Sequence, residues 1–407
     1  MGLASMGMDL GLDSTTALLD ALGRPDHQVP TVVHVAGSNG KGSVCALLAA
    51  LSQRLGHRTL LFTSPHVARI EERVRLDGRP MQATEFDEAI GRLRTASARI
   101  GVRPTFFEAT LLVSWILAAK HRVDVVVQET GLGGRLDATR ATRADLALVT
   151  SVSLEHASIL GGTLEAIMEE KAAIARPDVP LLIRDPEDAS VLDAAQRAAN
   201  RAGPPAELVV VPVPANCSVW TEARLLCAEA AQHLGWDVGE LEDLADRVRW
   251  PGRRQWIQPE HTGGAAVLVD AAHNPSGLRR VMPELVQAMR DEANLEGWSL
   301  VFGCTEQEDL DLLLSVLLEG MEPHPPSRIL LVAPEGGRRP GVAPSLLANH
   351  AWPVEAEVVE KVGDLREALR GATRPSLVVG SLYLAGNLIA ALGLDGDEDL
   401  ALLPSEG

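Results

Sequence analysis

The sequence predicts a two-domain α/β protein whose sheets are mainly parallel, and three observations indicate this fold class. A β-branched run that begins at Val32 leads through a glycine-rich turn into a helix with apolar residues at helical spacing up to Leu55. The mostly apolar stretch 123–129 is typical of a central parallel strand. Strands and helices then alternate a second time after residue 258, as in a small doubly wound domain.

The glycine-rich turn is the most informative local feature of the chain. Gly37, Gly40 and Gly42 interrupt the strand pattern, and Lys41 and Ser43 fall where the helix begins. Such a turn presents free backbone N–H groups and the positive end of the helix dipole, which suits a phosphate. Lys41 can reach the outer phosphates, and the Ser43 hydroxyl can face a Mg²⁺ ion. An ordinary glycine turn is the alternative, but a lysine and a hydroxyl in register favour nucleotide binding.

Three candidate metal ligands follow predicted strands: Ser64 in the turn after 59–63, Glu129 after 123–129, and His156 after 146–153. The carboxyl ends of parallel strands meet at one edge of an open sheet, where ligands bind. Taken singly, the Ser-Pro-His turn at 64 and a polar histidine at 156 are ordinary features. Together with a carboxylate they predict a crevice for a metal ion and a nucleotide.

The other predicted elements of the first domain surround this sheet. A short helix at 13–22 comes first, and the charged segment 68–80 is either a surface hairpin or a mobile loop. The helix at 105–120 is apolar nearly all round and therefore buried; Glu108 in its first turn either caps it or faces a substrate. A capped helix at 163–177 follows, whereas the stretch 180–215 gives little periodic signal beyond one short strand and one helix.

Trp250 to Arg253 reads as a hinge, which divides the chain into an ATP-binding domain at 1–249, a hinge at 250–257 and a C-terminal domain at 258–407. Five strands are predicted in the second domain, at 266–272, 299–303, 328–333, 354–359 and 376–380, with helices between them. The first of these strands ends in Asp270, close to His273, which is again a ligand position.

Composition narrows the classes of partner. The net charge of −18 argues against nucleic acid or an anionic membrane surface as the main partner. No apolar run is long enough to span a bilayer, and the N-terminus lacks the basic and apolar regions of a signal peptide. Four cysteines without a CxxC pair fit reduced thiols, so we expect a cytoplasmic protein.

Several motifs in order along the chain resemble those of the folylpolyglutamate synthase/dihydrofolate synthase family of the Mur ligase superfamily. The resemblance runs from about residue 10 to 390. Its most specific motifs are HVAGSNGKGS (34–43) and ETGLGGRLDAT (129–139), and the others are TSPH (63–66), RIEERVRLDG (69–78), TFFE (105–108), TSVSLEH (150–156), EKAAI (170–174), WPGR (250–253), DAAHNP (270–275) and GSLYLAG (380–386).

The resemblance implies an N-terminal P-loop ATPase domain of Mur ligase type and a smaller C-terminal Rossmann-like domain. It implies an ATP-dependent ligase that adds L-glutamate to dihydropteroate, to (tetrahydro)folate or to both, through an acyl phosphate, with release of ADP and phosphate. ATP and two Mg²⁺ ions would be needed, and we expect a monomer. The alternatives are a related enzyme that acts on another carboxylate and a nucleotide-binding module without folate activity.

Family roles transfer to the following positions of this sequence. The catalytic residues are Lys41, Lys171 and His273; the ATP contacts are Asn39, Gly40, Lys41, Gly42, Ser43, Asn216, Arg253 and Asp270; the metal ligands are Ser64, Glu129 and His156; and the pterin-side pocket is formed by Thr105, Phe106, Phe107, Glu108, Leu136, Asp137 and Ala138.

Lys171 is a special case because the resemblance implies that CO₂ carbamylates it. Only four of the 37 basic residues are lysines, so a lysine inside a family motif suggests amine chemistry that arginine cannot replace. A salt bridge is the alternative.

Three departures from the family pattern concern the acceptor side. Gln307-Glu308-Asp309 stands where an Asp-Lys-Asp is usual, and Arg140 stands where asparagine is common. The stretch between about 185 and 215 is short and lacks the usual strand pattern.

Overall fold

The computed structural model describes residues 11–154, 160–215, 217–239, 241–293, 297–337 and 339–404, and they form two compact units. Within the described residues, unit 1 comprises 11–66, 70–248 and 401–404, and unit 2 comprises 67–69 and 249–400. The chain therefore passes between the units at four places. The predicted single hinge at 250–257 accounts for only one of these places. Residues 67–69 belong to unit 2 although they lie within the sequence of unit 1, and residues 401–404 return to unit 1.

Unit 1 is built on an eight-stranded sheet with the order β4-β3-β2-β5-β1-β6-β7-β8. Five neighbouring pairs are parallel, and two pairs at one edge, β2–β3 and β3–β4, are antiparallel. The strands are β1 (Thr31–Ala36), β2 (Thr59–Phe62), β3 (Val74–Leu76), β4 (Arg79–Pro80), β5 (Val125–Glu129), β6 (Leu146–Val149), β7 (Leu181–Arg184) and β8 (Leu208–Val211).

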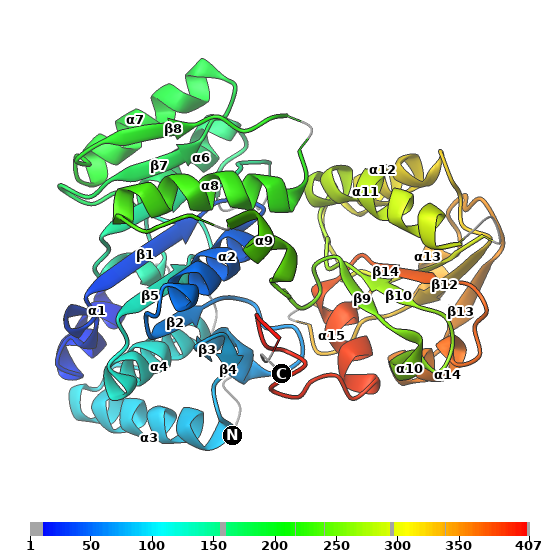
Figure 1. Ribbon diagram of the computed structural model, residues 1–407, viewed down its shortest axis with the longest axis horizontal. Coiled ribbons are helices and arrows are strands. Elements are labelled where there is room, and N and C mark those ends of the chain that lie inside the picture. The colour runs from blue at the N-terminus through cyan, green and yellow to red at the C-terminus, as the bar shows by residue number, and fades with distance from the viewer. Residues whose placement is uncertain are drawn as a thin grey trace. The chain divides into compact units, whose positions relative to one another are not determined.

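Helices cover this sheet (Figure 1). In the described part of unit 1, two groups can be distinguished, and the helices of each group pack against one another. The first group is α2 (Lys41–Arg54), α8 (Val219–Leu234) and α9 (Leu241–Arg247). The second is α1 (Asp13–Ala21), α3 (Ala83–Ile100) and α4 (Phe106–His121), which share an apolar core with β1, β2 and β5. The remaining helices are α6 (Leu164–Ala172), α7 (Ala189–Ala202) and the 3-10 turns η1 (Pro25–Gln28), η2 (Ile70–Arg73) and η3 (Ala138–Ala141).

Unit 2 contains a six-stranded sheet with the order β13-β12-β11-β14-β10-β9. Its pairs are parallel except that β9 runs antiparallel to β10, as expected for a doubly wound domain with an added edge strand. The strands are β9 (Gln255–Ile257), β10 (Val267–Val269), β11 (Ser299–Phe302), β12 (Arg328–Val332), β13 (Ala356–Val359) and β14 (Ser376–Val379).

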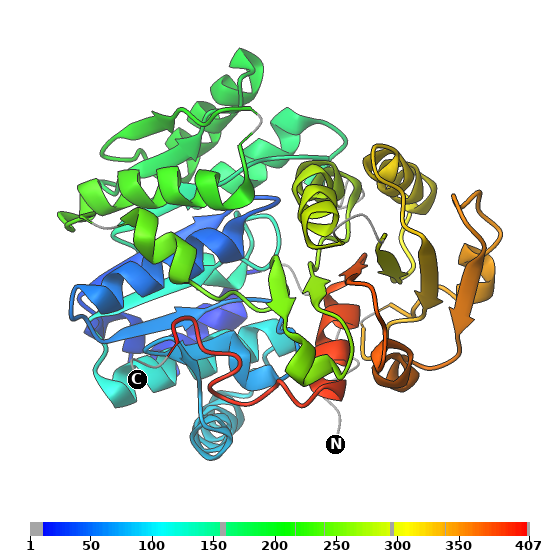
Figure 2. The same ribbon diagram turned by 45° about the vertical axis from the view of Figure 1, so that its right-hand side comes forward.

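Alternation along the strands builds a separate core on each face of this second sheet. Leu268 lies in a core with α11 (Pro275–Ala293) and α12 (Leu310–Met321), which pack side by side in Figure 2. Its neighbours Val267 and Val269 point to the other face and lie in a core with α15 (Leu382–Ala391). The helices are α10 (Pro259–Thr262), α11 (Pro275–Ala293), α12 (Leu310–Met321), α13 (Pro344–Leu347), η4 (Val362–Asp364), α14 (Leu365–Leu369) and α15 (Leu382–Ala391).

The structure confirms the two-domain α/β class. It also confirms the hairpin alternative for the segment 68–80, which contains β3 and β4, but several other local predictions are corrected. The 18-residue helix α3 had no predicted counterpart, and neither did β8 inside the stretch that lacks a clear strand pattern. Residues 255–257 of the expected hinge form β9, because their backbone pairs with β10.

Two features bear on the compositional predictions. Among the described helices, none combines the length and the apolar character that a membrane span requires. The four cysteines are free thiols, and three of them (Cys45, Cys227, Cys304) are buried.

Candidate functional site

The turn between β1 and α2 has the geometry of a phosphate loop. Gly40 occupies the helix N-cap with φ 84°, and Lys41 begins α2 directly after it. Gly37 has φ 144°, and a Cβ built there would lie 1.8 Å from Thr150 Oγ1. A side chain at 37 is therefore excluded both by the backbone conformation and by the close approach of Thr150. The strand, glycine turn and helix start that the sequence predicts are present, and phosphate binding at the N-terminus of α2 stays a prediction.

Residues 150–153, which follow β6, hold this loop in place. Ser38 N donates to Ser151 O over 2.7 Å, and Thr150 Oγ1 donates to Asn39 O over 2.8 Å. Asn39 Nδ2 reaches Ser153 Oγ at 3.2 Å. Asn39 thus supports the loop through its own backbone and side chain. The resemblance includes the motif at 150–156, but sequence reasoning assigned none of these hydroxyls a role.

Two lysines converge on one carbonyl oxygen of the phosphate loop. Lys41 Nζ donates to Gly37 O over 2.9 Å and to Ser38 O over 3.1 Å, and Lys171 Nζ also donates to Gly37 O over 2.9 Å. Lys171 lies on α6 and is only 1% exposed. The glutamates before it pair elsewhere: Glu169 with Arg197 and Arg201, and Glu170 with Arg135. The tertiary structure therefore brings Lys171 to the phosphate loop, although Lys171 comes 130 residues after Lys41 in the sequence.

Ser64 and Glu129 stand at the ends of neighbouring parallel strands, β2 and β5, next to the phosphate-loop strand β1. Ser64 N donates to Glu129 Oε2 over 3.0 Å, and Glu129 is 6% exposed. A carboxylate and a hydroxyl are hard oxygen ligands, which suit Mg²⁺ better than softer ions. His156 lies outside the described residues, and those residues contain no cluster of three or more His, Cys, Asp or Glu that could hold a metal ion by itself.

The predicted pterin-side residues at the start of α4 form a capping box. Thr105 Oγ1 accepts from Glu108 N, and Glu108 Oε2 accepts from Thr105 N over 2.7 Å. Glu108 Oε1 also accepts from Thr15 Oγ1 over 2.8 Å. The capping alternative for Glu108 is therefore confirmed, and a direct contact between Glu108 and a substrate stays a prediction.

Asp137 organises the loop that follows β5. Its carboxylate accepts hydrogen bonds from Gly131 N, Leu132 N and Thr139 N, and a fourth of 2.6 Å from Thr139 Oγ1. Burial raises the pKa of the Asp137 carboxyl, and these four donors oppose that shift. Ala138 is likewise buried. Both residues shape the loop from within, so direct substrate contacts by Asp137 and Ala138 stay predictions.

The aromatic pair of α4 lies between this loop and the turn after β2. The Arg73 guanidinium stands 4.9 Å from the centroid of the Phe106 ring, and Arg73 Nε donates to His66 Nδ1 over 3.0 Å. Phe107 packs its ring 5.8 Å from that of Phe62. Burial, followed by the charge of Arg73, lowers the pKa of His66, so this imidazole is neutral near pH 7. Sequence reasoning missed Arg73 and His66, although both belong to quoted motifs.

A buried histidine and a buried arginine tie the strand β1 to the loop after β5. His34 Nε2 contacts Thr130 Oγ1 at 2.9 Å and Thr139 Oγ1 at 2.8 Å. Arg176 Nη2 lies 3.4 Å from His34 Nδ1 and donates to Thr142 O over 2.9 Å. Burial, helped by the charges of Arg176 and Arg140, holds the pKa of His34 well below 6.5.

This shift predicts an acid-sensitive fold. As the pH falls below 6.5, the unfolded chain gains a proton on His34 that the folded chain does not take up. The free energy of unfolding should then fall by up to about 1.4 kcal/mol per pH unit until the pH reaches the lower, folded pKa. In His34→Gln that part of the slope should vanish, whereas His27→Gln, at an exposed position, should keep it. Urea titrations between pH 5 and 8 measure both slopes, and equal slopes in the two variants would contradict this assignment.

The predicted nucleotide contacts of unit 2 gather around the end of β10. Asp270 is 4% exposed, and its two oxygens accept from Arg254 N over 3.0 Å and Ala272 N over 2.9 Å. Burial raises the pKa of the Asp270 carboxyl, against the opposing charge of Arg253. Asp270 therefore fixes the turn that carries Arg253. Asn216 lies outside the described residues.

His273 follows the same strand and is exposed, with Nδ1 2.9 Å from Ala271 O. In the orientation of the Gln307 amide that satisfies its neighbours, the nitrogen donates to Asp309 Oδ1 and to His273 O, each over 3.2 Å. The departure at 307–309 is thus placed beside His273, within unit 2. Leu136 lies in the loop after β5 and is partly exposed.

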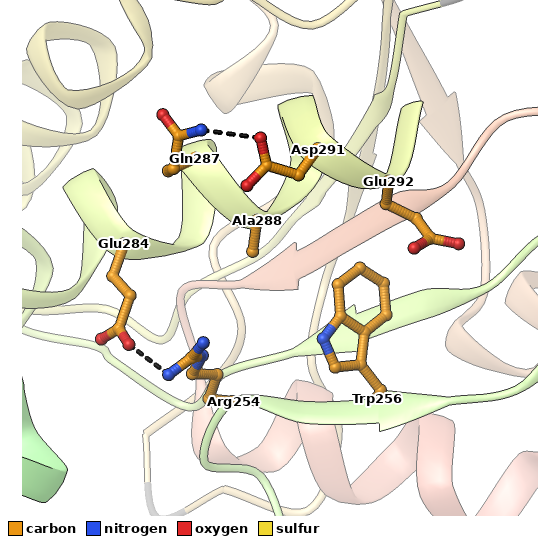
Figure 3. Close-up of a pocket in the computed structure, with 7 residues that line it drawn as sticks. All are labelled: Arg254, Trp256, Glu284, Gln287, Ala288, Asp291 and Glu292. Carbon is orange, nitrogen blue, oxygen red and sulfur yellow. Dashed lines mark hydrogen bonds and ion pairs between the residues drawn. The ribbon is translucent and has the colours of Figure 1, made fainter. Parts of the chain in front are cut away.

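A hollow of about 400 Å³ in unit 2 contains none of the predicted site residues (Figure 3). An ion pair between Arg254 and Glu284 lies at one end, and Gln287 donates to Asp291 over 2.7 Å at the other. Trp256, Ala288 and Glu292 complete the lining. Three of its lining residues carry carboxylates, which repel phosphate, so the loop of unit 1 stays the predicted phosphate site.

A further pair at the phosphate loop had no sequence signal. Glu222 on α8 is 1% exposed, and its Oε1 would lie 3.4 Å from a Cβ built on Gly40. Its Oε2 accepts from Arg184 Nε over 3.1 Å. The arginine at the carboxyl end of β7 thus balances a carboxylate that lies against the loop. Only the packing of α8 on α2 brings these residues together.

The fold defines an α/β protein of two units, and a glycine turn at a helix N-terminus, beside strands that end near Ser64 and Glu129, is an arrangement typical of nucleotide-binding proteins. The chain is 31% identical to the dihydrofolate synthase/folylpolyglutamate synthase of Haemophilus influenzae, over 75% of each chain. It belongs to the dihydrofolate synthase/folylpolyglutamate synthase family. No family model matches the chain.

The chain is also similar to a further relative and to solved structures whose names include folylpolyglutamate synthase or FolC. The chain is 30% identical, over 92% of its length, to the probable bifunctional folylpolyglutamate synthase/dihydropteroate synthase of Haloferax volcanii, of which it spans 47%. It thus covers less than half of that relative. Escherichia coli FolC in complex with DHPP and ADP superposes with a TM-score of 0.78 at 26% identity, over 96% of this chain and 95% of that chain. A bifunctional folylpolyglutamate synthase/dihydrofolate synthase with Mn, AMPPNP and L-glutamate bound gives 0.79 at 26% identity, over 96% of each chain.

Proposed function

We propose that this chain is an ATP-dependent amide ligase that adds L-glutamate to dihydropteroate, to (tetrahydro)folate or to both. The observation that carries the proposal is the convergence of Lys41 and Lys171 on one carbonyl of the loop, next to strands β5 and β2, which end at Glu129 and near Ser64. Family membership and the nucleotide, metal, glutamate and DHPP complexes of similar structures support the same reaction.

The reaction has two chemical steps. A carboxylate oxygen of the acceptor attacks the γ-phosphorus of ATP, ADP leaves, and an acyl phosphate forms. The amino nitrogen of glutamate then attacks the acyl carbon, loses a proton and expels phosphate, which leaves an amide. The protein mainly has to position the reactants and offset negative charge in the first step.

The residues of unit 1 suit that task. The loop N–H groups of Asn39, Gly40, Gly42 and Ser43 would hold the phosphates at the N-terminus of α2. Lys41 Nζ, which now donates to Gly37 O and Ser38 O of the same turn, would offset charge on the transferred phosphoryl group. Arg253, Asp270 and Asn216 are proposed to contribute further nucleotide contacts, and Asn216 lies outside the described residues.

Ser64, Glu129 and His156 are proposed to hold one Mg²⁺ ion, and a carbamylated Lys171 to help hold a second. When bound, these ions would supply positive charge to the phosphate oxygens. Carbamylation would turn a cation into an anion with two oxygens, yet the modified nitrogen keeps one N–H. Lys171 could then still donate to Gly37 O while its new carboxylate faces a metal.

The acceptor would lie along Phe106, Phe107 and Leu136, where aromatic and apolar surface is partly exposed. Thr105, Glu108, Asp137 and Ala138 would shape this pocket chiefly by holding its walls. His273 is proposed to act on the acceptor or glutamate side, near Gln307 and Asp309. We further propose a cytoplasmic monomer, with which the free cysteines are consistent.

The test is ATP consumption by the full chain in the presence of L-glutamate and either dihydropteroate or tetrahydrofolate. We expect ADP release that requires both the acceptor and glutamate, together with a product heavier by one glutamyl residue in mass spectrometry. Nucleotide binding without stimulation by either acceptor would instead support a ligase for another carboxylate or a nucleotide-binding module.

A further inference from the structure

Residues 67–69 follow the metal-binding turn directly, but they pack with the other unit. Val67 and Ala68 lie against the apolar core that contains α15. Arg69 forms an ion pair with Asp397, which is also part of unit 2. We name residues 67–69 the anchor segment. Both apolar contacts and an ion pair hold the anchor segment, so this segment is fixed to unit 2.

Gly386 on α15 is what permits this packing. A Cβ built there would lie 1.9 Å from Val67 O and 2.7 Å from Val67 C, distances that real Cβ atoms do not reach. Glycine inside a helix is about 1 kcal/mol less favourable than alanine. Its presence is explained by the approach of the anchor backbone, because Gly386 lies inside α15 and needs no unusual φ angle.

The anchor segment is tied closely to the candidate metal ligands. Only Pro65 and His66 separate Val67 from Ser64, whose N–H donates to the Glu129 carboxylate over 3.0 Å. The two intervening residues have little freedom, since proline fixes its own φ and His66 is bonded to Arg73 at 3.0 Å. A displacement of Val67 would therefore move Ser64 and alter the hydrogen bond from its backbone N–H to the Glu129 carboxylate.

We propose that Gly386 is a positioning residue for the metal site: by admitting the anchor backbone against α15, it sets the place of Ser64. The inference rests on the proposed function for the identity of the site. The Arg69–Asp397 pair serves the same purpose from the other end of the anchor segment.

The test compares Gly386→Ala with Gly320→Ala in the full chain. Both add a methyl group inside a helix of unit 2, but the nearest atoms to a Cβ at 320 belong to the side chain of Met282, the first of them 2.8 Å away, and not to backbone. Mn²⁺ binding in the presence of AMPPNP is followed by electron paramagnetic resonance, and ligation is followed against Mg²⁺ concentration. For Gly386→Ala we expect the metal midpoint to rise about 10- to 100-fold, as for residues that orient metal ligands. Gly320→Ala should lower the melting temperature and leave the midpoint unchanged.

A charge exchange provides the rescue. Arg69→Glu should raise the metal midpoint, and the double variant Arg69→Glu with Asp397→Arg should bring it back towards the wild-type value. Unchanged midpoints in both Gly386→Ala and Arg69→Glu would overturn the inference. If the wild type binds Mn²⁺ and nucleotide but forms no glutamyl product, the proposed function fails, whereas the Mn²⁺ readout still decides the role of Gly386.

Discussion

An enzyme with arginine in place of Lys171 is expected to lose about 10²- to 10³-fold in kcat for ligation while it still binds ATP. The variant keeps a positive charge and nearly the same length. What it loses is a primary amine, which can become neutral and form a carbamate, as a guanidinium does not under these conditions. The 1% exposure of Lys171 adds a second demand, because a planar guanidinium must fit where an ammonium now reaches Gly37 O.

Three measurements separate the carbamate from a simple misfit. Wild-type activity should fall in CO₂-depleted buffer and return with bicarbonate, and native mass spectrometry should show CO₂ on Lys171. Lys171→Ala should be partly rescued by chloride or acetate, which can supply the missing anion. The matched control is Lys120→Arg, at a surface lysine paired with Glu85 and Glu88, which should stay active. Full activity of Lys171→Arg would refute the carbamate.

The second large effect is expected for Glu129→Gln. The amide keeps the shape of the side chain and can still accept from Ser64 N, so the fold should survive. It holds Mg²⁺ far less well than a carboxylate does, and we expect activity at limiting Mg²⁺ to fall about 10²-fold.

Activity and Mn²⁺ binding are measured against metal concentration, with circular dichroism as the check on folding. Glu85→Gln makes the same change of charge in a surface pair and should leave the metal midpoint unaltered. If Glu129→Gln keeps the wild-type Mg²⁺ dependence, Glu129 does not belong to the site.

Much of the fold could be predicted because its signals are local. The alternation of apolar strands with amphipathic helices predicts parallel sheets in both units, and the structure confirms it. Helix α3 was not predicted although it is amphipathic, because two of its four buried residues are alanines, which make a weak apolar stripe. Strand β9 lies inside the expected hinge, because three residues carry too little pattern to be recognised without the partner strand β10.

The candidate site divides in the same way. Glu108 could be assigned two roles from its place in the first turn of a helix, and only the coordinates show its hydroxyl and amide donors at Thr15 and Thr105. Arg73 and His66 lie in quoted motifs, but nothing in their spacing places a guanidinium on the Phe106 ring. The Glu222–Arg184 pair joins helix α8 to the end of strand β7, and no motif or spacing in the sequence connects these two elements.

By itself the sequence determined the phosphate loop, since a strand, a glycine turn, Lys41 and a helix start are contiguous and need no other part of the chain. The same holds for Glu129, because a carboxylate that ends an apolar strand must lie at the ligand edge of a parallel sheet. Only the tertiary structure decided that Lys171 meets Gly37 and that residues 67–69 pack on Gly386. These contacts join segments that are far apart in the chain. Such contacts depend on packing and produce no periodic pattern in either segment, so the sequence alone does not reveal them.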